Sequence, residues 1–287
     1  MKKRPAFFLV MIFVILLTLM CSSNPIFKDE DSSSQRIVKG TVRLSDNSDP
    51  SHVFIWLEGL NVSTVTDESG EFILQIPPPQ SQPGGGMSGD FRLFAYVANY
   101  AFASLSVVIR DGYIQYDAGD VNSGGSLNDI IVLRKLLDIK TEIAPSEITE
   151  IDSLRLSLSV TLVPNYPPVK VQTYKNPEDN WLTRMIFREI SNPIDNAVLH
   201  AAGGILVTEN IRNPLIWHMG IKAWWLSPRL YRTLEPGVYD VIPYLRIVQD
   251  ELPDELIKSV GENADSFHHD YLRIPFRWDI AQLTVTQ

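Results

Sequence analysis

Strict alternation of apolar and polar residues constrains this chain more than any other feature of its sequence. Residues 154–162 read Leu-Arg-Leu-Ser-Leu-Ser-Val-Thr-Leu, so every second residue is apolar. A period of two places alternate side chains on opposite faces of an extended strand, and it therefore predicts a strand with one buried face. Residues 254–260, between Pro253 and Gly261, predict one short helix. The chain is expected to be all-β.

Short β-rich runs separated by turn residues fall into two groups. The first covers residues 36–44, 53–58, 62–65, 71–76, 91–97, 104–109 and 128–133, and the second covers 154–162, 169–174, 182–190, 198–208, 238–248 and 272–280. Strands of this length and spacing are typical of β-sandwiches. With 287 residues, of which 45% are apolar, the chain has enough material for two cores. We expect two tandem β-sandwich domains, at 36–136 and 152–287, with a linker at 137–151.

A tight turn followed by a strand lies in the middle of the first domain, at residues 66–77. Phe72, Leu74 and Ile76 share one face of the strand, and Gly70 supplies the positive φ angle that closes such a turn. This pattern predicts local structure, and it does not indicate a catalytic or ligand-binding function.

Three motifs of the first domain, this turn among them, follow one another in a characteristic order. They are Lys39-Gly40-Thr41-Val42, Val53-Phe54-Ile55-Trp56-Leu57 and Thr66-Asp67-Glu68-Ser69-Gly70-Glu71-Phe72. The set resembles the carboxypeptidase-regulatory-like, or transthyretin-like, domain, whose opening strand, second strand and T-D-x-x-G-x-F turn they match. The resemblance implies a transthyretin-like sandwich at 36–136 and a non-enzymatic accessory module. In the second domain, the turns at 176–180 and 234–239 are similar to the corners of immunoglobulin-like sandwiches, which implies that fold for 152–287.

A Pro/Gly-rich insertion, residues 77–90, departs from the family, whose members pass through a short turn at this point. Two interpretations remain, a recognition loop for a partner and a tolerated, poorly ordered excursion. We favour the second.

The N-terminus has the pattern of a signal peptide at 1–20. Lys2, Lys3 and Arg4 precede an apolar run that is shorter than the ~20 residues of a spanning helix, and the run ends at Cys21, the only cysteine. A lone cysteine there resembles the lipidated residue of bacterial lipoproteins, although Met20 is larger than the residue usual before it. The alternative is an incidental cysteine in an uncleaved anchor or an ordinary signal peptide.

Residues 21–35 are polar, rich in Ser and acidic residues, and without an apolar period, which predicts a flexible tether. Ser22 after the cysteine resembles lipoproteins sent to the outer membrane. We therefore expect a cell-envelope protein held at the membrane through acyl chains on Cys21.

The formal net charge of −9 argues against nucleic acid as a partner, because nucleic-acid affinity depends on Lys and Arg neutralising phosphates. No histidine lies in an H-x-x-E or H-E-x-x-H string, and there is no G-x-S-x-G motif, so no catalytic residues are assigned. Two groups contain residue types that bind metals but lack the spacing of a metal site, so no metal ligands are assigned. They are His268-His269-Asp270, and the loop residues Asp117, Asp120, Asn122 and Asp129. No cofactor is expected.

Aromatic residues of the second domain are the candidate ligand-binding set. Five of the six tryptophans lie there, and one group is Trp217, Trp224, Trp225 and Tyr231 in an expected long connection. Exposed aromatic rings stack against sugars and form protein hot spots, whereas the plain alternative is core packing.

These patterns predict an exported, lipid-anchored, non-catalytic binding or structural module of the bacterial cell envelope, whose partner is an envelope protein or a glycan. The alternatives are a carbohydrate-binding surface lipoprotein that uses the aromatic residues of the second domain, and a periplasmic hydrolase with dispersed acidic residues.

Overall fold

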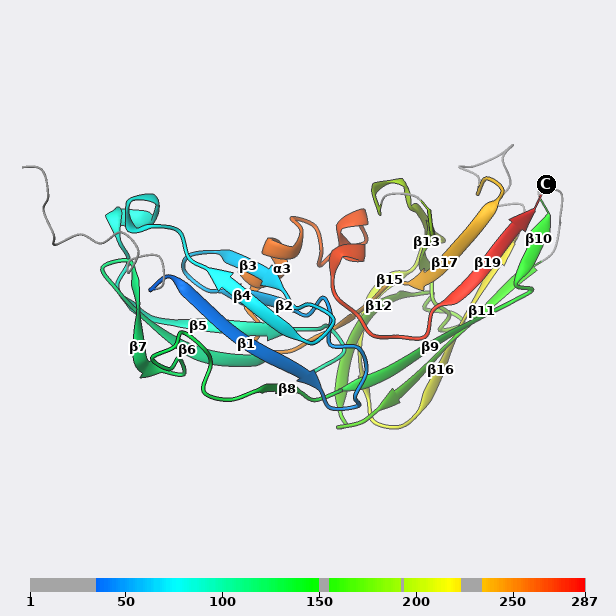
Figure 1. Cartoon of the computed structure of the whole chain (residues 1–287). Helices are drawn as coiled ribbons and strands as arrows, with labels where there is room; N and C mark the ends of the chain where they lie inside the picture. Colours follow the sequence, from blue (N-terminus) through cyan, green and yellow to red (C-terminus); the bar gives the residue numbers. More distant parts are fainter. Residues whose placement is uncertain (1–34, 150–154, 192–193, 223–233, 287) are drawn as a thin grey trace, which may run out of the picture.

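The computed structural model describes residues 35–149, 155–191, 194–222 and 234–286, and the fold is all-β in two units (Figure 1). The first unit contains β1 Ile37–Leu44, β2 Phe54–Leu57, β3 Val62–Val65, β4 Glu71–Gln75, β5 Gly89–Tyr96, β6 Ala103–Arg110, β7 Tyr113–Gly119 and β8 Ile131–Leu133, with two short 3₁₀ helices, η1 Pro79–Ser81 and η2 Pro83–Gly85.

The second unit contains eleven further strands of the described chain. They are β9 Leu137–Ala144, β10 Glu147–Thr149, β11 Arg155–Pro164, β12 Val169–Lys175, β13 Arg184–Glu189, β14 Val198–Ala201, β15 Ile205–Ile211, β16 Leu215–Lys222, β17 Gly237–Pro243, β18 Leu245–Ile247 and β19 Ala281–Thr286. The helices in the described part of this unit are η3 Ile194–Asn196, α3 Asp254–Val260 and η5 His269–Arg273.

Each unit is a sandwich of sheets around its own core. In the first unit the sheet β4-β1-β8 faces the sheet β3-β2-β5-β6-β7, and in the second the sheets are β10-β19-β17-β13-β14, β16-β11-β9 and β15-β12-β18. Strand pairs are antiparallel except β1 with β8 and β10 with β19. The first core includes Val42, Ile55 and Leu74, and the second includes Leu158, Trp217 and Val241.

The turn at 66–77 forms as its sequence predicts. Phe72, Leu74 and Ile76 are buried, and Gly70 has a φ of 80°. A Cβ atom at Gly70 would collide with the carbonyl oxygen of Val42. Asp67 Oδ1 accepts hydrogen bonds from the backbone N–H groups of Ser69 and Glu71, each at 2.9 Å. The helix prediction at 254–260 is also confirmed, as α3.

The expected linker at 137–151 is not a linker over its described part. Residues 137–144 form β9, which pairs with β11 through eight residue pairs, and 147–149 form β10 beside β19. The charged residues of β9 alternate with buried ones, because Leu137, Ile139 and Thr141 face the core. The second unit therefore begins directly where the first one ends.

Three other predicted segments differ. Residues 272–280 are not a strand, because Pro275 has no N–H for a ladder, and the segment runs from η5 into irregular chain. Residues 198–208 form two strands separated by Gly203 and Gly204, both with positive φ. Trp217, which was expected in a long connection, lies in the strand β16.

The insertion at 77–90 is ordered rather than loose. Gln82 is 4% exposed and its Nε2 donates to the carbonyl oxygens of Pro77 at 2.7 Å and Gly112 at 2.9 Å. Its Oε1 accepts from the backbone N–H of Met87 at 3.0 Å. One buried amide thus ties both ends of the loop to the turn after β6.

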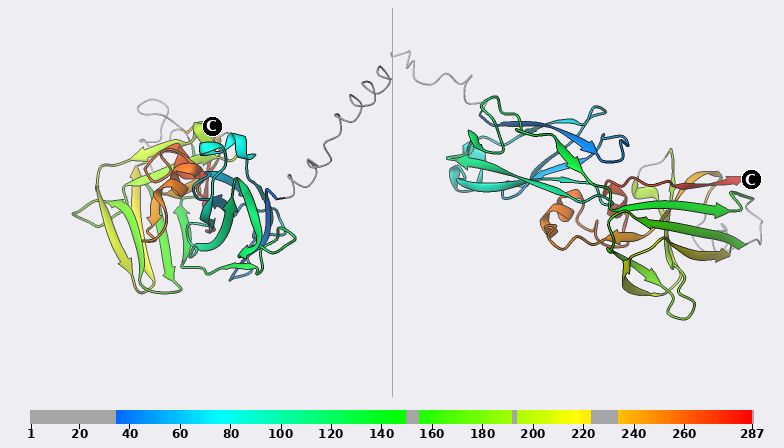
Figure 2. Two further views of the ribbon diagram at one scale, coloured as in Figure 1. Left: turned by 90° about the vertical axis from the view of Figure 1, so that its left-hand side faces the viewer. Right: turned by 90° about the horizontal axis from the view of Figure 1, so that it is seen from below.

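Residues 249–280, here called the bridging segment, connect β18 to β19 and lie where the two units meet. The segment appears in orange to red in Figure 1, and Figure 2 shows the same junction from two further sides. Among the described residues, no helix is long and apolar enough to cross a membrane.

Candidate functional site

A third apolar core joins the two units. The first unit contributes Trp56, Phe94, Tyr96 and Ala98, the second contributes Ile186, Ile242 and Tyr244, and the bridging segment contributes Leu256, Ile257, Tyr271 and Ile274. All of these side chains are at most 8% exposed. Burying a large apolar side chain stabilises a fold by about 1.5–3 kcal/mol, so this core fixes the units against each other.

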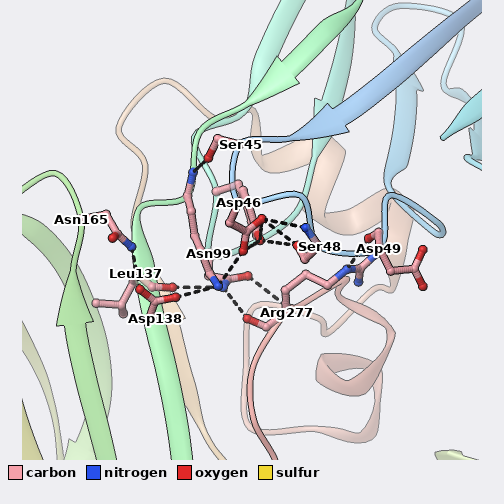
Figure 3. Close-up of polar contacts among 11 residues, drawn as sticks. Ser45, Asp46, Ser48, Asp49, Asn99, Leu137, Asp138, Asn165 and Arg277 are labelled. Atoms are coloured by element: carbon pink, nitrogen blue, oxygen red, sulfur yellow. Dashed lines mark hydrogen bonds and ion pairs between the residues drawn. The ribbon is translucent and has the colours of Figure 1, made fainter. Parts of the chain in front are cut away.

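Asn99 and Arg277 connect the first unit to the bridging segment by hydrogen bonds (Figure 3). Asn99 is fully buried; its Nδ2 donates to the carbonyl oxygens of Leu137 at 3.1 Å and Arg277 at 2.6 Å, and its Oδ1 accepts from the N–H of Arg277 at 3.0 Å. The Arg277 guanidinium donates to the carbonyl oxygens of Asp49 and Ser51. Backbone groups from three distant segments are satisfied by these two side chains.

A charged cluster centred on Asp46 lies beside this junction (Figure 3). Asp46 accepts hydrogen bonds from Ser48, from the Tyr100 hydroxyl at 2.9 Å and from the Lys135 ammonium at 2.9 Å. Lys135 also pairs with Asp138 at 2.6 Å. Partial burial acts to raise the pKa of Asp46, but the hydrogen bonds from Lys135, Ser48 and Tyr100 outweigh it and hold that pKa well below its ordinary value.

A cleft of about 710 Å³ opens between the units next to this network. The first unit supplies Ser48 and Asp49, β9 supplies Ile139 and Lys140, and the bridging segment supplies most of the apolar wall. The apolar wall residues are Tyr271, Leu272, Ile274, Phe276, Trp278 and Ile280. The other lining residues are largely polar, and they include Asp49, Lys135 and Arg188. A large cleft at a domain interface that combines an apolar wall with polar groups is a common form of ligand site, so this cleft is the candidate functional site.

The cations of the cleft are already held by acceptors of the protein. Arg188 pairs with Asp240, Lys140 with Glu142 at 2.7 Å, and Lys135 with Asp46 and Asp138. Side chains that are tied in this way keep their positions, which suits a preformed binding surface.

Phe276 and Trp278 form the most regular aromatic feature of the wall. Their rings are stacked, with centroids 4.6 Å apart and planes 10° apart. Phe276 also packs on Tyr271, at a centroid distance of 5.7 Å. Stacking and packing fix both rings where they line the cleft. Their sequence signal was the run of alternating residues at 272–280, in which Pro275 marks irregular chain rather than a strand.

The predicted ligand-binding residues do not gather at this cleft. Trp224, Trp225 and Tyr231 lie outside the described residues, as does the lipidation candidate Cys21. Trp217 is 2% exposed in the second core, and the Lys175 ammonium lies 4.1 Å from its ring centroid. Such a ring has no open face for a ligand, so the platform interpretation of Trp217 is wrong and its role is core packing.

The two groups weighed as metal ligands serve local structure. The ring of His268 accepts from the N–H of Asp270 and caps η5, and His269 contacts the carbonyl oxygen of Ala197 at 2.9 Å. Asp120 accepts from the N–H of Ser106 at 2.7 Å, and Asn122 from the N–H of Gly124 at 2.9 Å. Across the described ranges, no three His, Cys, Asp or Glu residues are grouped to hold a metal ion.

Fold and site together define the class as an all-β protein of two fused units with a cleft between them. No family model matches the chain. No curated protein matches it either.

Solved structures show only distant similarity. A variant of BcpA, the major pilin subunit of Bacillus cereus, has 10% identity and a TM-score of 0.27, with 75% of this chain and 67% of that chain covered. The Bacillus anthracis TIE protein has 6% identity and a TM-score of 0.22, with 88% and 34% covered. Unmodified BcpA has 12% identity and a TM-score of 0.23, with 72% and 63% covered. Superpositions this loose carry no conclusion about function.

Proposed function

We propose that this protein is an exported, lipid-anchored, non-catalytic binding module of the bacterial cell envelope, which holds an envelope component in the cleft between its two units. The observation that carries the proposal is the cleft itself, whose walls come from both units and are fixed by the third core. The proposal includes a transthyretin-like first unit, which the hydrogen-bonded turn at Asp67 and Gly70 supports.

The anchor is proposed from the sequence, where Cys21 follows the apolar run of the signal peptide. Radiolabelled palmitate is expected to label the native chain, and Cys21→Ala is expected to abolish labelling and release the protein into the soluble fraction. Ser22→Ala is the matched neighbour control and should keep the label. Equal labelling of the Cys21→Ala chain would rule the anchor out.

Binding in the cleft is tested with the full chain immobilised on a sensor surface. Purified outer-membrane proteins and purified peptidoglycan are passed over it, and Trp278→Ala is compared with Trp181→Ala. Trp181 is an exposed tryptophan that does not line the cleft, so it controls for loss of an aromatic ring. Binding that is lost in Trp278→Ala and kept in Trp181→Ala supports the cleft; equal binding by both variants argues against it.

Carbohydrate recognition is the second candidate, and the stacked pair Phe276–Trp278 favours it because fixed aromatic rings suit the apolar faces of sugars. A glycan array is expected to give selective binding that Trp278→Ala removes and Trp181→Ala retains. A uniformly blank array, together with retained binding to an envelope protein, would leave the first candidate alone.

A further inference from the structure

A second, smaller cavity lies on the junction and shares only Ile274 with the lining of the cleft. It has a volume of about 220 Å³ and is bounded by β5 of the first unit, β18 of the second unit and α3. The polar residues that matter are Tyr96, Arg246, Asp250, Asp254 and Asp265. Apolar packing in the third core does not account for these polar groups around the cavity.

One side of this cavity presents two hydrogen-bond donors, the Tyr96 hydroxyl and the partly exposed Arg246 guanidinium. Tyr96 is 3% exposed, and within the described chain its hydroxyl has no hydrogen-bond partner. Burial raises the pKa of Tyr96, so the hydroxyl keeps its proton at neutral pH. Arg246, which acts electrostatically on Tyr96, makes only one long ion pair among the described residues, 3.8 Å to Asp265. Because the Tyr96 hydroxyl and the Arg246 guanidinium both border the cavity with donor capacity left over, this side favours an anionic acceptor.

The outer end has the opposite charge. Asp250, Asp254 and Asp265 are exposed at the rim. Asp250 is paired with Lys170 at 2.6 Å and Asp265 with Arg246, while Asp254 has no ion pair in the described part of the chain. A simple anion would therefore meet carboxylates on its way in, and a simple cation would leave Tyr96 and Arg246 unsatisfied.

We propose that this cavity is a binding site for a small zwitterion that carries a carboxylate and an ammonium group, as a free amino acid does. The carboxylate accepts from the Tyr96 hydroxyl and the Arg246 guanidinium, and the ammonium group faces Asp254 at the rim. Because Tyr96 belongs to one unit and Arg246 to the other, an occupied site also strengthens the junction.

The first experiment is calorimetric titration of the full chain with free α-amino acids and ω-amino carboxylates at millimolar concentration. Alkylamines and carboxylic acids of matching length are the control ligands, since each keeps one charge only. Binding by at least one zwitterion and by neither single-charge analogue is expected. Equal binding of an amine or an acid, or no heat from any zwitterion, overturns the proposal.

Variants locate the site. Tyr96→Phe removes only a hydroxyl without a partner, so we expect an unchanged melting temperature and roughly tenfold weaker binding. Arg246→Gln and Asp254→Asn should weaken binding similarly, and Asp254→Asn, at the exposed start of α3, gives a readout even if a buried variant fails to fold. Tyr239→Phe, whose hydroxyl bonds to Glu235 away from the cavity, is the matched control. Native affinity in Tyr96→Phe and Asp254→Asn would contradict the proposal.

Discussion

Single polar side chains determine how the two units meet. Asn99 lies after β5 and Arg277 near the end of the chain, and they are 178 positions apart. Each of the three hydrogen bonds of the Asn99 amide satisfies a buried or partly buried backbone group at the junction. No local pattern in the sequence marks either residue, because their partners come from distant segments.

Replacing Asn99 with Ala is expected to lower the free energy of unfolding by about 3 kcal/mol, because the carbonyl groups of Leu137 and Arg277 lose their donor. Urea denaturation followed by fluorescence measures the change. Asn122→Ala is the control, since its side chain caps a surface loop, and it should cost clearly less. A cost for Asn99→Ala no larger than that of the control would show that water replaces the lost bonds.

The lowered pKa of Asp46 predicts a dependence on acid. A carboxyl group with a lowered folded-state pKa stabilises the fold above its ordinary pKa of about 4, and the contribution is lost as the pH falls from there toward the lowered pKa. The difference in free energy of unfolding between the native chain and Asp46→Asn should therefore narrow between neutral pH and about pH 3. If the difference in free energy of unfolding stays constant over this range, the negative charge of Asp46 does not contribute to stability.

Individual strands are the level at which the sequence is most informative. Alternation located β1, β4 and β11 closely, because one face of each meets a core and the other is more exposed. It failed where charges concealed β9 and where Pro275 interrupts an alternating run that is not a strand, and β7 was not predicted. The cleft was not predicted either, because its aromatic wall lies on residues 272–280, which were expected to form a strand.

The ordered insertion gives a prediction at the level of the element. Gln82→Ala should lower the free energy of unfolding by about 2 kcal/mol, because two carbonyl groups and one N–H group lose the buried amide. Gln80→Ala, two residues away on the exposed side of the same loop, is the control and should change little. If both variants match the native chain in chemical denaturation, the loop is as dispensable as its composition suggests.

Because the third core contains residues of both units, we expect the two units to unfold together. Strand β2 is buried on both faces, with Ile55 in the first core and Trp56 in the third. Its nearly continuous apolar sequence is typical of a strand covered on both sides, but the covering segment lies some two hundred positions further along the chain. The local sequence of β2 identifies the strand, but it does not identify the segment that covers it.

Leu256→Ala tests this coupling. The side chain is fully buried in the third core, and its truncation should cost about 2–5 kcal/mol and lower the melting temperature of one cooperative transition. Lys258→Ala, exposed on the same helix, is the control. Calorimetry that resolves two transitions, of which only one shifts, would show that the units melt independently.

The position of the bridging segment in the sequence affects how the protein folds during its synthesis. A ribosome makes residues 249–280 only after the first unit is complete, yet these residues cover Trp56, Phe94 and Tyr96 of that unit. Until then the nascent first unit presents an uncovered aromatic surface, which invites aggregation. A fragment that ends before residue 249 is therefore expected to aggregate rather than to fold as a smaller functional protein. During synthesis, the same aromatic surface is a defined binding site for a chaperone.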